Sequence, residues 1–271
     1  MKNIYRFILI LILTSCSNKT SQTIDFKVGY SPNKEYRLSQ TQTSENNVKY
    51  NGSDEILSNL KNNGVANPTI TNTTSIMKSI SKTGELDGNQ FPLDIEVLES
   101  SNKTLNKGMR MHGKSMDGIT KIDSITNSPM TEKKKIELLT SMETSLNNIK
   151  YPERKISIGE SFEQTSITSM PIADVTIELE IKSIYTLNKI ENGVGYFDLN
   201  QIYEIKSATK DYVMSLDGTG QGKINYDIEQ QFFTKYYSEM EMNLKTELEL
   251  FNIEIQTKSV TNQTTEIKAS R

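Results

Sequence analysis

The feature that most constrains this chain is an alternation of apolar and polar residues with a period of two. It is strongest in the segment from 239 to 250, where the apolar residues Met240, Met242, Leu244, Leu248 and Leu250 are interleaved with polar ones. The same period recurs over residues 175–181 and 197–205. A period of two places one face of a strand in the core and the other in water. The pattern therefore predicts half-buried antiparallel strands.

Turn and helix signals divide these strands. Asn192-Gly193 separates two alternating runs, and both residue types tolerate the positive φ of a tight hairpin turn. Residues 53–64 begin with the N-cap residue Ser53 and end in Gly64, which predicts a short helix. Residues 131–150 carry apolar residues at helical spacing, which predicts a longer amphipathic helix. We expect the helices to cover a face of the sheet.

Internal similarity indicates a duplication. At a constant offset, Gly88 corresponds to Gly193, Met109 to Met214, and Gly113 to Gly218. A hydrophobic residue followed by glycine opens each half, at residues 28–29 and 158–159. The expected fold is mainly β: a curved, half-barrel-like antiparallel sheet of two duplicated strand sets, residues 24–150 and 154–271. Residues 76–119 and 181–224 should then superpose about a pseudo-two-fold axis. The alternative is that any two hairpins with glycine turns look alike.

The N-terminus has the features of an export signal. Lys2 and Arg6 precede seven consecutive apolar residues at positions 7–13, which are too few to cross a bilayer core of about 20 residues. The sequence Leu-Thr-Ser-Cys at positions 13–16 follows and resembles the lipobox of bacterial lipoproteins. The resemblance implies that residues 1–15 are removed and that Cys16, the only cysteine, is lipidated.

The same resemblance predicts a location. Residues 16–23 form a lipidated cysteine and a flexible polar tether, and residues 24–271 form a single β-rich domain. Position 17 is Ser, whereas Asp there retains such lipoproteins in the inner membrane. We therefore expect a lipid anchor in the outer membrane, with the domain facing the periplasm. The membrane is the expected partner through this anchor, and a protein partner is left unidentified.

Composition argues against several other functions. With 31 Lys and Arg against 34 Asp and Glu, the chain lacks the basic surface that nucleic acid requires. A single His and a single Cys leave little for a catalytic triad or a metal site, so we expect no enzyme, no cofactor and no metal. His112 is interpreted as a polar residue at the edge of a turn, because no nucleophile or second base is identified beside it.

Two other motifs have more than one interpretation. Paired methionines, Met109 with Met111 and Met240 with Met242, could offer soft sulfur ligands to Cu(I), although packing or the lining of an apolar groove explains them better. Residues 218–223 contain three glycines and a lysine but lack the ending of a phosphate-binding loop. We interpret this segment as a hairpin turn.

The chain as a whole is similar to an uncharacterised group of Gram-negative bacterial lipoproteins. Its lipobox, its two hydrophobic-Gly starts and its glycines at 218, 220 and 222 carry that resemblance. By weaker analogy, the expected sheet resembles the half-barrel of periplasmic lipoprotein carriers. One hypothesis is an apolar or acyl ligand between the concave face and the 131–150 helix; the alternative is a structural or interaction lipoprotein with a filled core. The groove residues would be Phe197, Leu199, Met240, Met242, Leu244, Leu139, Met142 and Leu146.

Overall fold

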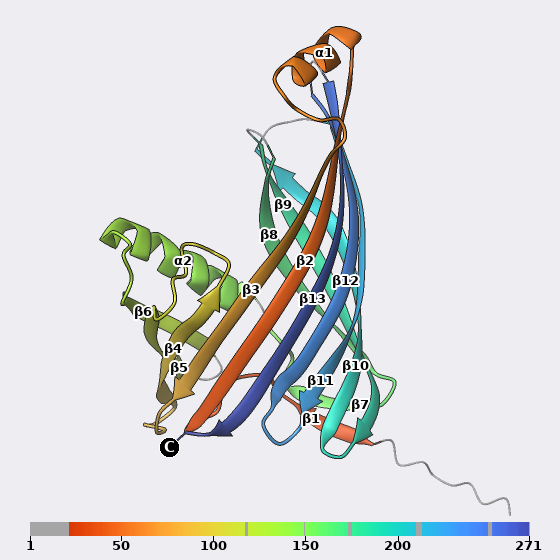
Figure 1. Cartoon of the computed structure of the whole chain (residues 1–271). Coiled ribbons are helices and arrows are strands. Elements are labelled where there is room, and N and C mark those ends of the chain that lie inside the picture. Colours follow the sequence, from red (N-terminus) through yellow and green to blue (C-terminus); the bar gives the residue numbers. More distant parts are fainter. Residues whose placement is uncertain are drawn as a thin grey trace, which may run out of the picture.

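The computed structural model describes residues 22–116, 119–148, 150–172, 175–209, 213–248 and 251–270, without the side chains of 144–148 and 171–172. The described chain is mainly β, as expected, with a large, curved, open antiparallel sheet (Figure 1). The strands are β1 (Thr23–Phe26), β2 (Lys34–Gly52), β3 (Thr69–Thr83), β4 (Gln90–Ser100), β5 (Arg110–Met116), β6 (Ile119–Thr126), β7 (Arg154–Ser157), β8 (Ser161–Ile172), β9 (Val175–Glu191), β10 (Val194–Ala208), β11 (Val213–Asp227), β12 (Phe232–Glu247) and β13 (Phe251–Ala269), and the helices are α1 (Asp54–Asn62) and α2 (Glu132–Asn148).

The large sheet has 11 strands in the order β6-β5-β4-β3-β2-β13-β12-β11-β10-β9-β8. Two up-and-down meanders, β2 to β6 and β8 to β13, run across it in the same direction. They join where β2 pairs with β13, and each of these two strands is 19 residues long. Because β6 and β8 do not pair with each other, they form the two edges of the sheet.

The two faces of the sheet differ in chemistry. Cross-strand register assigns the apolar residues to one face, here called the inner face, and most charged residues to the outer face. A continuous inner-face row runs across the strands as Thr73, Ser44, Ser259, Met240, Gly220, Gln201, Ser183 and Gln164. The described buried polar residues are all uncharged Ser, Thr or Gln. Small hydroxyl and amide groups thus lie between the apolar zones of the inner face. A hydrogen bond offsets the cost of burial where one forms, as from Gln201 Nε2 to the Ser183 hydroxyl (3.1 Å), whereas the buried Thr246 and Thr265 hydroxyls have no partner among the described residues.

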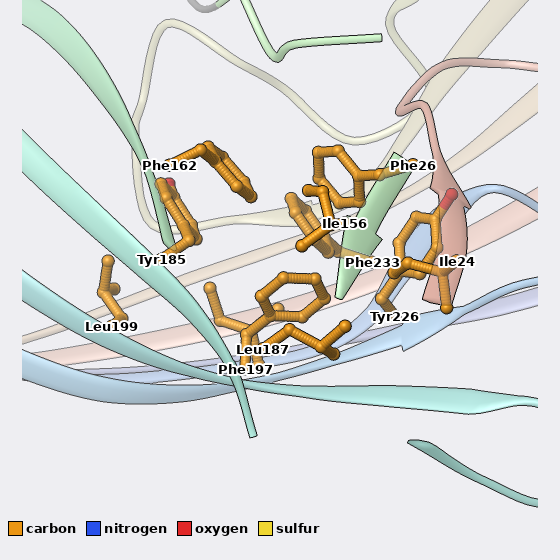
Figure 2. Close-up of a cluster of buried hydrophobic side chains, with 11 residues drawn as sticks. Ile24, Phe26, Ile156, Phe162, Tyr185, Leu187, Phe197, Leu199, Tyr226 and Phe233 are labelled. Atoms are coloured by element: carbon orange, nitrogen blue, oxygen red, sulfur yellow. The ribbon is translucent and has the colours of Figure 1, made fainter. Parts of the chain in front are cut away.

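A small two-stranded ribbon covers the part of the inner face that strands β8 to β12 form. β1 and β7 pair antiparallel, and Ile24, Phe26 and Ile156 of this ribbon are buried. They pack against aromatic and aliphatic residues of the large sheet, as Figure 2 shows. Thr23, which was expected to belong to a tether, is the first residue of this ribbon, and the sequence did not predict the ribbon. Its strands of four residues are too short for alternation to identify.

The two helices lie at different places and do not share a covering role. α1 begins after Ser53, whose side chain accepts a hydrogen bond from the Ile56 backbone N–H (3.4 Å). It stands beyond the end of the long strands, opposite the β1–β7 ribbon (Figure 1), and has no buried residue. The expectation that the short helix covers a face is therefore wrong. α2 packs on β6 and covers only the β4–β6 end of the sheet.

The structure places the repeat signals in comparable but not identical settings. Gly88 and Gly193 both have positive φ, and they lie in the β3–β4 and β9–β10 turns. β1 precedes β2 as β7 precedes β8, and β1 pairs with β7, which is the arrangement that a two-fold relation between the halves would produce. The superposition of 76–119 on 181–224 remains a prediction.

Two interpretations of turns are wrong. Residues 218–223 lie in the middle of β11, where the glycines face inward and pair with β10 and β12. An added Cβ at Gly218 would lie 2.9 Å from the Cβ of Tyr203, so a neighbouring side chain occupies the space above this glycine. His112 also lies within a strand, β5, and not at the edge of a turn.

Candidate functional site

The residues expected to line one groove fall into three separate clusters of the inner face. Phe197 and Leu199 belong to the cluster under the β1–β7 ribbon. Met240, Met242 and Leu244 belong to a second cluster nearer the α1 end of the strands. The described parts of α2, including Leu139 and Met142, pack against a third cluster of β4, β5 and β6. The side chain of Leu146 lies outside the described residues. The structure does not bring these residues together as one surface.

The ribbon cluster is an aromatic core centred on Phe26. Its ring centroid lies 4.8 Å from that of Phe162, 5.0 Å from that of Tyr226 and 5.5 Å from that of Phe197. Phe26, Phe197 and Leu199 are each 1% exposed. Such tilted ring contacts contribute beyond the area they bury. The position expected to bind a ligand is thus filled by the chain's own N-terminal strand (Figure 2).

Tyrosine hydroxyls on the inner face lie in apolar surroundings. Burial is the main reason that the pKa of Tyr185 is raised above its ordinary value, with Tyr151 nearby adding to the effect. Burial also raises the pKa of Tyr203 to about 12. A neutral hydroxyl is therefore strongly preferred over a phenolate at these positions. These shifts report the low dielectric of a packed interior.

The second cluster explains the Met240 and Met242 pair by packing. Met242 is 8% exposed and Leu244 is fully buried, and the cluster includes the buried Val175, Ile177 and Leu179 of β9. Met109 and Met111 are likewise buried in the α2 cluster. Within the described residues no group of three His, Cys, Asp or Glu could hold a metal ion. The thioethers fill irregular space between strands, a role that suits their flexibility.

His112 lies on the outer face with two hydrogen-bonding partners that no sequence spacing indicated. Its Nδ1 lies 2.5 Å from Asp94 Oδ1 and its Nε2 lies 2.9 Å from Thr126 Oγ1. A shallow cavity of about 260 Å³ beside it also contacts Lys82, Glu96 and Arg110. Register places Asp94, His112 and Thr126 on adjacent strands, so the sequence separates residues that the sheet brings together. The Asp and His side chains are 61% and 39% exposed, which favours a cross-strand polar contact in water.

An open depression of about 650 Å³ lies on the outer face of β10 to β13. Two charged side chains on its walls form an ion pair, Lys258 with Glu241 at 3.0 Å, and Glu239 accepts a hydrogen bond from the Tyr237 hydroxyl. Lys223 and Asp198 pair beside a neighbouring depression, and this contact lowers the pKa of the Asp198 carboxyl. The depressions thus carry solvated ion pairs, which contribute little to stability individually.

Comparisons with known proteins do not assign the chain to a family. No family model matches it, and no curated protein matches it. Among solved structures, it is similar to an outer membrane channel from Pseudomonas putida F1, with 8% sequence identity and a TM-score of 0.20, over 90% of this chain and 97% of that one. A similarity at that level carries no argument about this protein. In the described part of the chain, neither helix is long and apolar enough to cross a membrane.

Proposed function

We propose that this protein is a lipid-anchored envelope lipoprotein that acts through its surface, with an interior filled by its own side chains. The observation that supports the proposal best is the aromatic cluster in which Phe26 occupies the inner face beside Phe197. Leu187, Leu199 and Leu244 are at most 1% exposed, so the described inner face has little room for a chain-like ligand near them. The remaining route to function is recognition of a partner by exposed surface.

In this proposal, lipidated Cys16 anchors the protein in the outer membrane, and the domain lies in the periplasm. Thr23 is the first residue of β1, so only a short segment separates Cys16 from a strand that is paired with β7. Six intervening residues span at most about 20 Å when fully extended. The β1–β7 end would therefore lie near the lipid surface. The 19-residue strand β2 would carry α1 about 60 Å away from that end.

The alternative is that an apolar ligand binds under α2. This helix covers the apolar cluster of β4, β5 and β6 less completely than β1 and β7 cover the aromatic cluster around Phe26. Leu138, Leu139 and Met142 are only partly buried against the sheet, whereas the sheet residues Leu93 and Val97 below them are fully buried. A helix held by half-buried contacts can separate from its cluster at a lower free-energy cost than a buried strand.

The experiment measures ligand uptake and stability on the same variants. We would titrate the purified mature protein with a fluorescent fatty-acid probe and unfold it in urea. The proposal predicts no saturable probe binding by the wild type. It also predicts that the double variant Met242→Glu with Leu244→Glu loses several kcal/mol of unfolding free energy, because two charges would enter a packed core.

Two further variants separate the hypotheses. Val213→Lys is the control, because Val213 is 66% exposed and stands opposite Glu247, so a positive charge there should leave stability within about 0.5 kcal/mol of wild type. Leu139→Glu tests the alternative under α2. Saturable probe binding by the wild type that Leu139→Glu abolishes, in a protein that remains folded, would contradict the filled interior and support the ligand hypothesis.

A further inference from the structure

The two edges of the large sheet are protected to very different degrees. An unpaired strand edge is a template for association, and proteins usually block it with charges, bulges or covering elements. β6 has all three: it carries Lys121 and Asp123, a bulge leaves Asp123 without a partner opposite, and α2 packs on the strand. This edge is closed to further pairing.

The opposite edge, β8, carries no such protection over most of its length. All 12 residues of β8 pair with β9 in a continuous register without a bulge. From Gln164 to Met170 the strand reads Gln-Thr-Ser-Ile-Thr-Ser-Met, without a charged residue. Such a flat, uncharged and β-branched segment is the kind of edge that pairs with another strand.

The side chains of β8 from Thr165 to Ser169 are also largely exposed to solvent. Ile167 is 40% exposed, and Thr165, Thr168 and Ser169 are exposed as well. The described residues outside β9 make no backbone hydrogen bond with β8. Side chains satisfy two carbonyls near its start, where Arg154 donates to the Ser161 oxygen (3.3 Å) and Gln164 Nε2 donates to the Thr165 oxygen (2.7 Å). The edge from Ser166 onward is left available.

We propose that β8 pairs antiparallel with β8 of a second copy of this chain, about a two-fold axis at Ile167. The segment is self-complementary in this register. Ile167 faces its own copy, Thr165 faces Ser169, and Ser166 faces Thr168. One exposed apolar pair therefore forms on the axis, with two hydroxyl pairs on each side of it. Glu163 faces Pro171 and not another carboxylate, so no like charges oppose each other. A two-fold interface of this type closes on itself and forms a dimer without further growth.

The other possible occupants fit the edge less well. An extended segment of a different protein could add to β8 by the same backbone hydrogen bonds, but nothing on the strand selects for one. The proposal does not depend on the lipid anchor or on the filled interior, since only β8 and its exposed residues carry it. It can therefore fail while the proposed function stands, and the reverse also holds.

The test is a charge exchange at the two-fold axis. The chain carrying Cys16→Ser, which lacks the expected anchor and the chain's only cysteine, would be analysed by light scattering coupled to size exclusion. We expect a dimer at high concentration, and monomers for Ile167→Lys and for Ile167→Glu, because each places like charges directly opposite each other. Mixing the two variants should restore the dimer, since Lys then faces Glu.

Ile202 provides the matched control. It is 41% exposed on the outer face of β10, away from either edge of the sheet, and it stands opposite Lys182 of β9, so the charge of Ile202→Glu is accommodated there and should leave the dimer unchanged. A second measurement introduces Ile167→Cys in the same background, which should give a disulfide-linked dimer under oxidising conditions, while Ile202→Cys should not. A chain that is monomeric at every concentration, or a dimer that survives Ile167→Lys, would overturn the proposal.

Discussion

The side chain of Tyr226 holds the backbone of Lys27, although 199 residues separate them in the sequence. The Tyr226 hydroxyl donates a hydrogen bond to the Lys27 carbonyl oxygen (2.7 Å), and the Lys27 N–H lies 3.3 Å from the same hydroxyl. Tyr226 belongs to β11 and its ring is fully buried beside Phe26. This contact fixes the end of β1, and therefore the ribbon, against the large sheet.

Replacing Tyr226 with Phe should weaken this attachment without opening the core. The ring contacts remain, and both hydrogen bonds between the hydroxyl and the Lys27 backbone are lost, which costs about 2 kcal/mol of unfolding free energy. Urea unfolding followed by circular dichroism measures the change. Tyr196→Phe is the control, because Tyr196 lies on the outer face of β10 and its replacement should change stability by less than about 0.5 kcal/mol. Equal losses for the two variants would contradict the role assigned to Tyr226.

The sequence predicted the regular elements well because their signals are local. Alternation over 175–181 and 240–247 corresponds to long strands, with Leu250 outside the described residues, and the Ser53 N-cap identified α1. The inner-face packing could not be predicted, since it depends on which distant strands become neighbours. Phe26, in a strand of four residues, fills the space that Phe197 and Leu199 were expected to leave open for a ligand. Only the alternation of Ile24 and Phe26 signalled it, and two residues are too few to distinguish from chance.

The roles of glycines were equally hard to predict from sequence, because glycine serves both in tight turns and where two backbone segments lie very close together. Gly193 is a hairpin glycine with φ of 75° and open space around it. Gly113 lies within β5, and an added Cβ there would lie 2.0 Å from the Lys121 carbonyl oxygen. The sequence does not distinguish the two settings, whereas the structure assigns a conformational role to one and a steric role to the other.

Gly113→Ala should therefore be strongly destabilising. The obstructing atom belongs to the backbone of the paired strand β6, so β5 and β6 would have to separate, and we expect a loss of about 3 kcal/mol. The measurement is the urea midpoint at constant slope. Gly29→Ala is the control: nothing lies within 4 Å of the added Cβ and φ is not positive, so stability should stay the same or rise slightly. A tolerated Gly113→Ala would show that β6 is less firmly paired than the register indicates.

Buried tyrosines predict a loss of stability in alkali. The pKa of Tyr203 is raised to about 12 by burial, compared with 10 in the unfolded chain. A raised folded-state pKa contributes stability that is fully present below pH 10 and is lost as the pH rises through 12. Other inner-face tyrosines, Tyr185 and Tyr236 among them, have pKa values shifted in the same direction by burial. The unfolding free energy should therefore fall between pH 10 and 12.

Urea unfolding at a series of pH values tests this prediction, with tyrosinate absorbance recorded in parallel. Absorbance from the buried tyrosines should appear together with unfolding. Tyr203→Phe should make the decline between pH 10 and 12 shallower, because one group that ionises only in the unfolded chain has been removed. A decline of the same slope in both proteins would contradict the assignment of this effect to Tyr203.

The last prediction concerns Cys16, which precedes the described residues by only a few positions. A basic segment, seven apolar residues and Leu-Thr-Ser-Cys stand consecutively, and the only cysteine of the chain completes the motif. An intramolecular disulfide is impossible without a second cysteine. More than one acyl chain on Cys16 would make membrane attachment stable, since a single chain binds only marginally.

Cys16→Ala should abolish incorporation of radiolabelled palmitate and release the protein into the soluble fraction. Ser17→Asp is the matched variant: it should keep the label but shift the protein from the outer to the inner membrane fraction. Label that persists in Cys16→Ala would refute the anchor, and an unchanged fraction for Ser17→Asp would refute the sorting rule while leaving the anchor intact.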